Sequence, residues 1–248
     1  MIELAGLQRT FQVGDQPVHA LRDLSLTLAA GEYVAVMGPS GSGKTTLLNI
    51  LGLLDRPDAG SYRLAGVETT TLDEEARAKL RRERIGFVFQ SFHLIPRLTA
   101  FENVELPLIL AGLAPRERRP RVTTMLEAVG LTPRAHHRPD QLSGGQRQRV
   151  AIARATVMEP SLILADEPTG NLDHASGEEV IRTLERLNDR GLTLVVVTHD
   201  PAISGRARRR IRMEDGAVVD DQIGAGPPAE PIVKQARPGA SPGDGTGR

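Results

Sequence analysis

A glycine-rich loop between an apolar run and a helical pattern restricts the fold of this chain more than any other feature. Tyr33–Met37 is a short continuous apolar run, which is typical of a strand covered on both faces of a sheet. The loop Gly38–Gly43 follows, and leucines at helical spacing then predict a helix over Thr45–Leu54. A buried strand that leads into a helix indicates an α/β fold with a mainly parallel sheet.

Further apolar runs and helical patterns alternate along the chain. Strands are predicted at Ile85–Phe89, Leu162–Ala165 and Leu192–Val197, and helices at residues 73–84 and around 178–190. Alternation of this kind favours a sheet with helices on both faces.

Two regions depart from this alternation. Near the N-terminus Leu24, Leu26 and Leu28 alternate with polar residues, as in a half-buried strand, and we assign this region to an N-terminal antiparallel β subdomain. Between Gln90 and Glu159 no clear strand occurs, and helical stretches dominate. We therefore predict one domain over 1–223, with a core formed by 1–90 and 157–223, a helical subdomain inserted at about 91–156, and a Pro/Gly-rich disordered tail over 224–248.

Composition excludes several classes of function. The chain has 31 Lys plus Arg and 31 Asp plus Glu, and this balance disfavours a broad nucleic-acid-binding surface. It has no Cys, which excludes disulfides, Cys-ligated zinc and iron–sulfur clusters. No apolar stretch reaches the roughly 18–20 residues that span a bilayer, and Met1–Leu4 lacks the features of a signal sequence. We expect a soluble intracellular chain whose membrane role, if it has one, passes through a partner.

The glycine-rich loop has the composition of a phosphate-binding loop. Residues 38–45 match G-x-x-x-x-G-K-[ST], between a strand and a helix. Glycines allow successive N–H groups to point inward, and the helix directs its positive end to the same place. Lys44 would reach the β- and γ-phosphates and the Thr45 hydroxyl would bind Mg²⁺, which predicts a P-loop NTPase core. The alternatives are a Gly/Ser-rich loop without a ligand and a dinucleotide fingerprint, and the second lacks the acidic residue expected about 20 positions later.

Two carboxylates follow the predicted strand at 162–165. Asp166 stands where P-loop NTPases hold Mg²⁺, mainly through water, and Glu167 lies one residue further out, where it can orient an attacking water. The alternative for Glu167 is a charge at a helix N-terminus or a surface ion pair.

Leu142–Gln146 forms a second candidate anion site. It combines a Ser hydroxyl, two glycines and the start of a predicted helix, and it contains no Lys. In isolation such a pentapeptide is also compatible with a flexible loop at a helix start.

In their order and spacing these motifs resemble those of an ABC-type ATPase subunit, over about residues 1–220. The resemblance implies that Gln90 is the Q-loop glutamine, which contacts Mg²⁺ and water, and that residues 142–146 are the signature motif. It also implies a D-loop at Asn171–Asp173 and a switch histidine at His199, which contacts the γ-phosphate. Phe11 is implied to stack on adenine, although a packed strand residue remains an alternative.

The resemblance thus implies a site for ATP and Mg²⁺. Catalytic roles fall to Lys44, Gln90, Glu167 and His199, and Mg²⁺ to Thr45, Gln90 and Asp166. The residues implied to bind nucleotide are Phe11, Gly38, Pro39, Ser40, Gly41, Ser42, Gly43, Lys44, Thr45, Thr46, Gln90, Ser143, Gly144, Gly145, Gln146, Asp173 and His199.

The family also implies partners. Two copies close head to tail around two ATP molecules and drive an integral membrane permease on a separate chain, so the protein would be cytoplasmic and peripheral on the inner face of the cell membrane. Residues 52–57, 90–99, 102–104 and 164–173 resemble the bacterial lipoprotein-release and macrolide-export subgroup, which includes a cell-division relative. An ATP-gated regulatory switch that acts through a membrane protein without transport is the alternative.

Other readings have weaker support. An ABC ATPase of DNA repair or translation would carry long coiled-coil insertions or two ATPase units, and neither fits in 248 residues. A GTPase would carry an Asn-Lys-x-Asp motif, which this sequence lacks. His136 and His137 lack further ligands at metal-binding spacing. The arginines between 206 and 212 could meet anionic lipids or nucleic acid, but a solvated edge strand and turn is our prediction.

Overall fold

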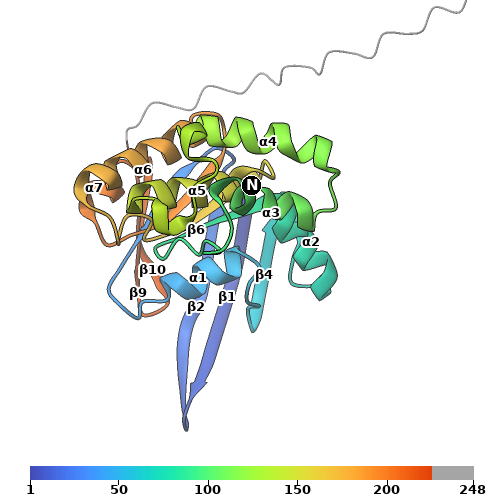
Figure 1. Cartoon of the computed structure of the whole chain (residues 1–248). Helices are drawn as coiled ribbons and strands as arrows, with labels where there is room; N and C mark the ends of the chain where they lie inside the picture. The colour runs from blue at the N-terminus through green and yellow to red at the C-terminus, as the bar shows by residue number, and fades with distance from the viewer. Residues whose placement is uncertain (225–248) are drawn as a thin grey trace, which may run out of the picture.

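The computed structural model describes residues 1–224 and contains two sheets (Figure 1). The predicted tail over 224–248 lies, except for Gly224, outside the described residues. The larger sheet is mainly parallel, and only its β9–β10 pair is antiparallel. Its strand order is β10 (Ala217–Ile223), β9 (Arg209–Glu214), β3 (Tyr33–Met37), β8 (Thr193–Val197), β7 (Leu162–Asp166) and β6 (Ile85–Phe89).

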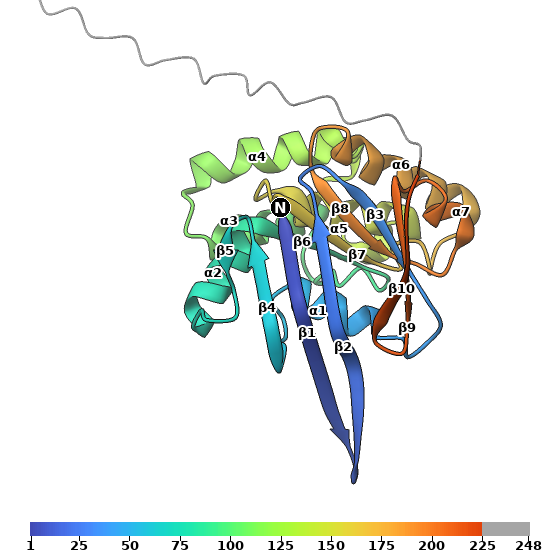
Figure 2. The ribbon, with the colours of Figure 1, turned by 180° about the vertical axis from the view of Figure 1, so that it is seen from behind.

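The second sheet is antiparallel and confirms the predicted N-terminal β subdomain. Its strand order is β2 (Gln16–Leu28), β1 (Ile2–Val13), β4 (Ala59–Leu64) and β5 (Val67–Glu68). Leu24, Leu26 and Leu28 are buried, as their alternation predicts. The β1–β2 hairpin projects well beyond the rest of the sheet (Figure 2).

The central strands separate two apolar cores. Along β3, Tyr33 and Ala35 belong to a core shared with the helices, whereas Val34 and Val36 belong to a core shared with the antiparallel sheet and α1 (Lys44–Leu51). Because side chains alternate between the faces of a strand, a continuous apolar run is required when both faces are covered. The other helices are α2 (Glu74–Arg84), α3 (Ala100–Leu110), α4 (Pro115–Ala128), α5 (Gly144–Thr156), α6 (His174–Asn188) and α7 (Pro201–Ser204), with short 3₁₀ turns at Thr132–Arg134 and Pro139–Gln141.

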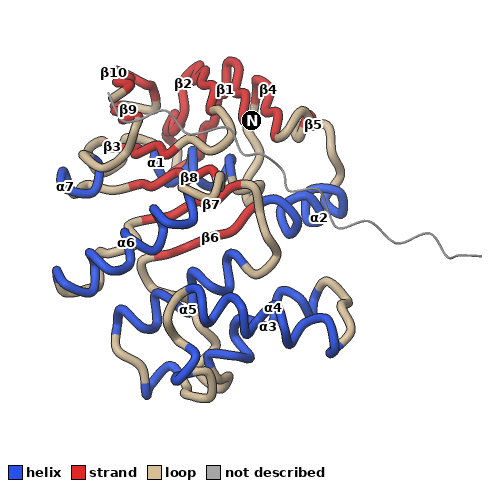
Figure 3. The backbone as a smooth tube through the Cα atoms, turned by 90° about the horizontal axis from the view of Figure 1, so that it is seen from above, coloured by secondary structure: helices blue, strands red, loops and turns tan. Residues whose placement is uncertain are grey.

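Helices α3, α4 and α5 follow one another between β6 and β7. They lie together on the side of the molecule away from the antiparallel sheet (Figure 3), and α5 packs against both β6 and α3. None of the helices in residues 1–224 has the length and apolarity to cross a bilayer.

Two helix boundaries differ from the sequence prediction because of local capping. Helix α6 begins at His174, four residues before the predicted start, because the Asp173 carboxylate accepts a hydrogen bond from the N–H of Ser176 at 3.0 Å. Helix α1 ends at Leu51 and not at Leu54, since Gly52 terminates it and Leu53 is left-handed, with φ of 56°.

The prediction that the arginine cluster lies on an edge strand is wrong. Strand β9 pairs with β3 on one side and β10 on the other, and β10 forms the edge. The arginines are also paired with carboxylates: Arg206 with Glu178 and Glu185, and Arg209 with Glu32 and Asp221. These four contacts offset the charge of two of the five arginines, Arg206 and Arg209.

Candidate active site

The carboxyl ends of β3, β6, β7 and β8 bring the predicted catalytic segments together. The strand register aligns Val36 with Val197, Val197 with Asp166, and Asp166 with Phe89, so the four strands end at one level. The loop of residues 38–43, the pair Asp166–Glu167, His199 and Gln90 therefore follow neighbouring strand ends. Ligands of open α/β sheets bind at this edge.

The glycines of the phosphate loop are required by its path. Gly41 and Gly43 are left-handed, with φ of 81° and 96°. A Cβ on Gly43 would lie 2.3 Å from the backbone oxygen of Ala20, because β2 passes directly against the loop. Only glycine fits here, since the backbone approaches too closely for any side chain.

The Lys44 ammonium is held at this loop by the loop's own oxygen atoms. Its Nζ donates to the carbonyls of Gly38 at 2.9 Å and Pro39 at 2.8 Å, and lies 3.4 Å from the Ser42 hydroxyl. Lys44 is also the first residue of α1, so its charge is added to the positive end of that helix. The arrangement is suited to binding a polyphosphate.

Asp166 provides a half-buried carboxylate beside this loop. Burial raises the pKa of the Asp166 carboxyl above its ordinary value, the neighbouring Glu167 raises it further, and the Lys44 ammonium acts in the opposite direction.

Thr45 is exposed on the first turn of α1. Within residues 1–224 no group of three His, Asp or Glu side chains could hold a metal by itself. A hydroxyl and one carboxylate suit Mg²⁺, which keeps several waters and shares substrate phosphates.

Glu167 and His199 form a hydrogen-bonded pair. The Glu167 carboxylate accepts from the His199 backbone N–H at 3.1 Å and lies 2.8 Å from Nδ1 of the ring. The backbone of Glu167 is left-handed, with φ of 45°, and its N–H donates to Val197 O at 2.9 Å. This uncommon conformation turns the carboxylate toward the end of β8.

We expect this pair to appear in the titration of His199. The hydrogen bond to Glu167, with the carboxylate's charge, raises the pKa of His199 above its ordinary value. The pair therefore stabilises the folded protein fully below the ordinary pKa of histidine. This stabilisation is lost as pH rises through the higher pKa that His199 has in the folded protein. NMR of the imidazole protons should place the His199 midpoint above that of exposed histidines, and Glu167→Gln should lower it. An unchanged midpoint in that variant would contradict the pairing.

Gln90 meets the loop that carries Asn171. Gln90 Nε2 donates to Asn171 Oδ1 at 3.2 Å, and Asn171 Nδ2 donates to the Gln90 carbonyl at 3.2 Å. A Cβ on Gly170 would lie 2.6 Å from Gln90 Nε2, so a larger residue here would displace the Gln90 side chain. The predicted Q-loop and D-loop are thus in direct contact within one chain.

The second candidate anion site lies at the first turn of α5. Ser143 and Gln146 form a reciprocal cap, each side chain accepting from the other's backbone N–H, at 3.2 and 3.0 Å. Gly145 packs against Ser176 at the start of α6, where Asp173 binds Ser176 through its backbone and its hydroxyl. Backbone hydrogen bonding by Ser176 lowers the pKa of Asp173. Within residues 1–224 no hydrogen bond joins residues 143–146 to the phosphate loop.

Phe11 lies on the surface and not in the core. It is 38% exposed on β1, opposite Val18 of β2. The Arg9 guanidinium covers its ring at 4.6 Å from the centroid. An exposed aromatic ring near the strand that passes the phosphate loop can still offer a stacking surface.

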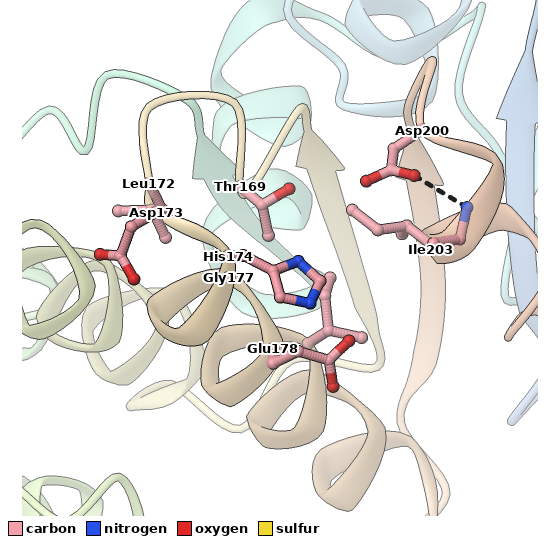
Figure 4. Close-up of a pocket in the computed structure, with 10 residues that line it drawn as sticks. Thr169, Leu172, Asp173, His174, Gly177, Glu178, Asp200 and Ile203 are labelled. Atoms are coloured by element: carbon pink, nitrogen blue, oxygen red, sulfur yellow. Dashed lines mark hydrogen bonds between the residues drawn. The ribbon is translucent and has the colours of Figure 1, made fainter.

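A pocket of about 280 Å³ adjoins the site but does not contain the phosphate loop (Figure 4). It lies between the loop at Thr169–His174, helix α6 and the start of α7, and its lining includes Asp173 and Asp200. Asp200 caps α7 by accepting from the N–H of Ala202 at 2.8 Å.

Two polar residues of α5 that the sequence analysis did not single out hold the site's backbone. Arg154 donates to the carbonyls of Phe92 at 3.0 Å and His93 at 2.5 Å, which are consecutive left-handed residues after Gln90. Gln148 donates to the carbonyls of Phe89 and Pro168. A polar residue in a helix gives no local signal of such distant partners.

Comparison with known proteins identifies relatives of this arrangement. The family model described as ABC transporter matches residues 21–170. The chain is 55% identical over 221 residues to the macrolide export ATP-binding/permease protein MacB of Rhodopseudomonas palustris (strain BisB18), covering 89% of this chain and 34% of MacB. It is 49% identical over 242 residues to MacB of Burkholderia pseudomallei (strain K96243), covering 98% and 37%. The chain thus spans about a third of the length of these curated relatives.

A solved structure is similar over most of the chain. It is the dimeric, post-hydrolysis state of the ATP-binding cassette MJ0796 bound to ADP and Pi. The TM-score is 0.83 at 45% identity, covering 91% of this chain and all of MJ0796.

Proposed function

This chain belongs to the ABC transporter family and is an ATP hydrolase, and from that premise we propose that it is the ATP-driven subunit of a bacterial transporter. The observation that carries the proposal is the meeting of four segments at neighbouring strand ends: the phosphate loop, Asp166, the Glu167–His199 pair and Gln90. The phosphate loop supplies the Lys44 cation that would bind phosphate. Asp166 supplies an oxygen ligand for Mg²⁺, and Glu167 supplies a carboxylate that would orient water.

Each residue would have a separate role in hydrolysis. The backbone N–H groups of residues 38 and 40–43 and the Lys44 ammonium would bind the β- and γ-phosphates of ATP. Thr45, Asp166 and Gln90 would hold Mg²⁺, directly or through water. When bound, Mg²⁺ neutralises charge on the transferred phosphoryl group.

Glu167 and His199 would act on the attacking water. The Glu167 carboxylate orients it and accepts its proton, while His199 fixes one carboxylate oxygen and can contact the γ-phosphate. Phe11, Pro39, Ser40 and Thr46 complete the nucleotide contacts that we propose for one chain.

The second anion site supports a homodimer. Residues 143–146 offer a helix N-terminus, a hydroxyl and glycines but no cation, so alone they form half of a triphosphate site. We propose that they bind the γ-phosphate held by the phosphate loop of a second copy, with Asp173 at the contact. The dimeric structure of MJ0796, bound to ADP and Pi, supports this arrangement.

A membrane partner completes the proposal. The MacB relatives are named ATP-binding/permease proteins, and this chain matches about a third of their length. We propose that it drives a permease of the lipoprotein-release or macrolide-export type, on a separate chain, from the inner face of the cell membrane. We retain the division into a core, 1–90 and 157–223, and a helical subdomain at about 91–156, which the grouping of α3–α5 supports.

The test combines hydrolysis with identification of the partner. The purified chain should release phosphate from ATP with Mg²⁺ and dimerise in ATP when Glu167 is glutamine. A permease that co-purifies should transport substrate in vesicles only with hydrolysable ATP. ATP-dependent binding without flux would instead favour the regulatory switch, and absence of hydrolysis would contradict the proposal.

A further inference from the structure

The strands that carry Gln90 and Glu167 stop pairing just before these residues. The β6–β7 ladder runs from Ile85 opposite Leu162 to Phe89 opposite Asp166. Beyond that pair, no ladder hydrogen bond fixes the distance between the two segments. In the proposed mechanism hydrolysis depends on that distance, because Gln90, which would contact Mg²⁺ and water, and Glu167, which would orient the water, must meet at one place.

Gln148 joins the two segments just past the end of the ladder. Its Nε2 donates to Phe89 O at 3.2 Å and to Pro168 O at 2.6 Å. Phe89 immediately precedes Gln90, and Pro168 immediately follows Glu167. One side-chain amide therefore continues the pairing of β6 with β7 by one further link.

Gly170 and Asn171 provide a second connection between the segments that carry Gln90 and Glu167. Gln90 and Asn171 exchange two hydrogen bonds, and the N–H of Gly170 donates to Glu167 O at 3.0 Å. Gln90 and Glu167 are thus part of a closed ring of hydrogen bonds and short backbone segments. Among residues 1–224, Gln148 is the only residue of α5 in this ring.

The orientation of the Gln148 amide is fixed by its surroundings. The residue is fully buried, at 0% exposure, and its Nε2 faces two carbonyl oxygens, so the flipped amide would place an oxygen against both. Within residues 1–224 its Oε1 has no hydrogen-bond partner.

We infer that Gln148 is a positioning residue for ATP hydrolysis: its amide holds the backbone beside Gln90 and beside Glu167 at a fixed separation. The inference rests on the proposed function. Helix α5 also presents residues 143–146 in its first turn, and Gln148 lies only two residues after Gln146. The helix that carries the second anion site is thereby tied to the water-orienting residues of its own chain.

The test separates turnover from binding. Gln148→Met keeps the length of the side chain and removes both donors, and it should lower kcat at saturating ATP by about tenfold to a hundredfold. The Kd for ATP should stay within about twofold, because residues 38–45 are untouched. Gln8→Met, at an exposed position of β1, is the matched control.

A second variant covers the case in which Gln148→Met folds poorly. Gln148→Asn keeps the amide but is one methylene too short to bridge both carbonyls, and it should also lose kcat at constant Kd. Melting temperature and circular dichroism would identify the folded fraction. A folded variant with kcat within twofold of wild type, or with a higher Kd and unchanged kcat, would overturn the inference. Absence of hydrolysis by the wild-type chain would overturn the proposed function and this inference with it.

Discussion

Glu167→Gln should lower steady-state ATP hydrolysis by about 10²–10⁴-fold, while the Kd for ATP changes little. The amide oxygen of glutamine can still accept the hydrogen bond from the His199 backbone, so the geometry of the strand end is retained. What is lost is the negative charge that orients water and takes its proton. The substitution should lower kcat and leave the Kd for ATP nearly unchanged, because the carboxylate acts on the water and not on the bound phosphates.

Three measurements check this result. Phosphate release gives kcat, and titration with a fluorescent ATP analogue gives Kd. Since the variant binds ATP without consuming it, gel filtration with ATP should also give a larger dimer fraction than for wild type. Glu83→Gln, at an exposed position of α2, is the control for loss of one carboxylate. Near-normal turnover would remove Glu167 from the proposed mechanism.

The strands of the larger sheet that are covered on both faces could be predicted because their signal is local. Ile85–Phe89 is apolar throughout, and the structure places β6 on those residues, since both faces of the sheet are covered. Strand β7 similarly extends the predicted run at Leu162–Ala165 by one residue, to Asp166. A strand that is covered on both faces can be recognised in the sequence as a continuous apolar run.

The misplaced features depend on distant partners or on a cap. The pairing of β10 with β9 is signalled only by the two-residue turn Asp215-Gly216, which the prediction did not use, so the arginines of β9 suggested an edge. The start of α6 was misplaced because the apolar pattern begins later than the Asp173 cap. Helical periodicity reports burial, whereas a helix begins where its first N–H groups find an acceptor.

Some residues of the candidate site could be predicted from the sequence, and others could not. Lys44, Asp166 and Glu167 follow strand ends in recognisable motifs, so their meeting could be expected from the sequence and the strand order. Gln148 and Arg154 could not, because their acceptors are backbone carbonyls far along the chain. Those of Gln148 lie 59 (Phe89) and 20 (Pro168) residues away, and those of Arg154 lie 61 (His93) and 62 (Phe92) residues away. A contact between a helix side chain and a distant carbonyl leaves no pattern in either segment.

Lys44→Ala should weaken ATP binding on the order of a hundredfold, about 3 kcal/mol, because a hydrogen-bonded charge at the phosphates is removed. The fold itself should be little affected. The Lys44 side chain is only partly buried, and the carbonyls of Gly38 and Pro39 that it leaves can be hydrated. Without nucleotide the melting temperature should therefore stay within about 3 °C of wild type.

The chain offers a matched control for this change. Lys79 is an exposed lysine of α2, and Lys79→Ala removes the same charge away from the phosphate loop. Saturating ATP should raise the melting temperature of wild type and Lys79→Ala alike, since a ligand stabilises in proportion to ln(1 + [L]/Kd). Lys44→Ala should show almost no shift at the same ATP concentration. An ATP-induced shift equal to that of wild type would mean that Lys44 does not bind the nucleotide, and the phosphate contact would have to come from the loop N–H groups alone.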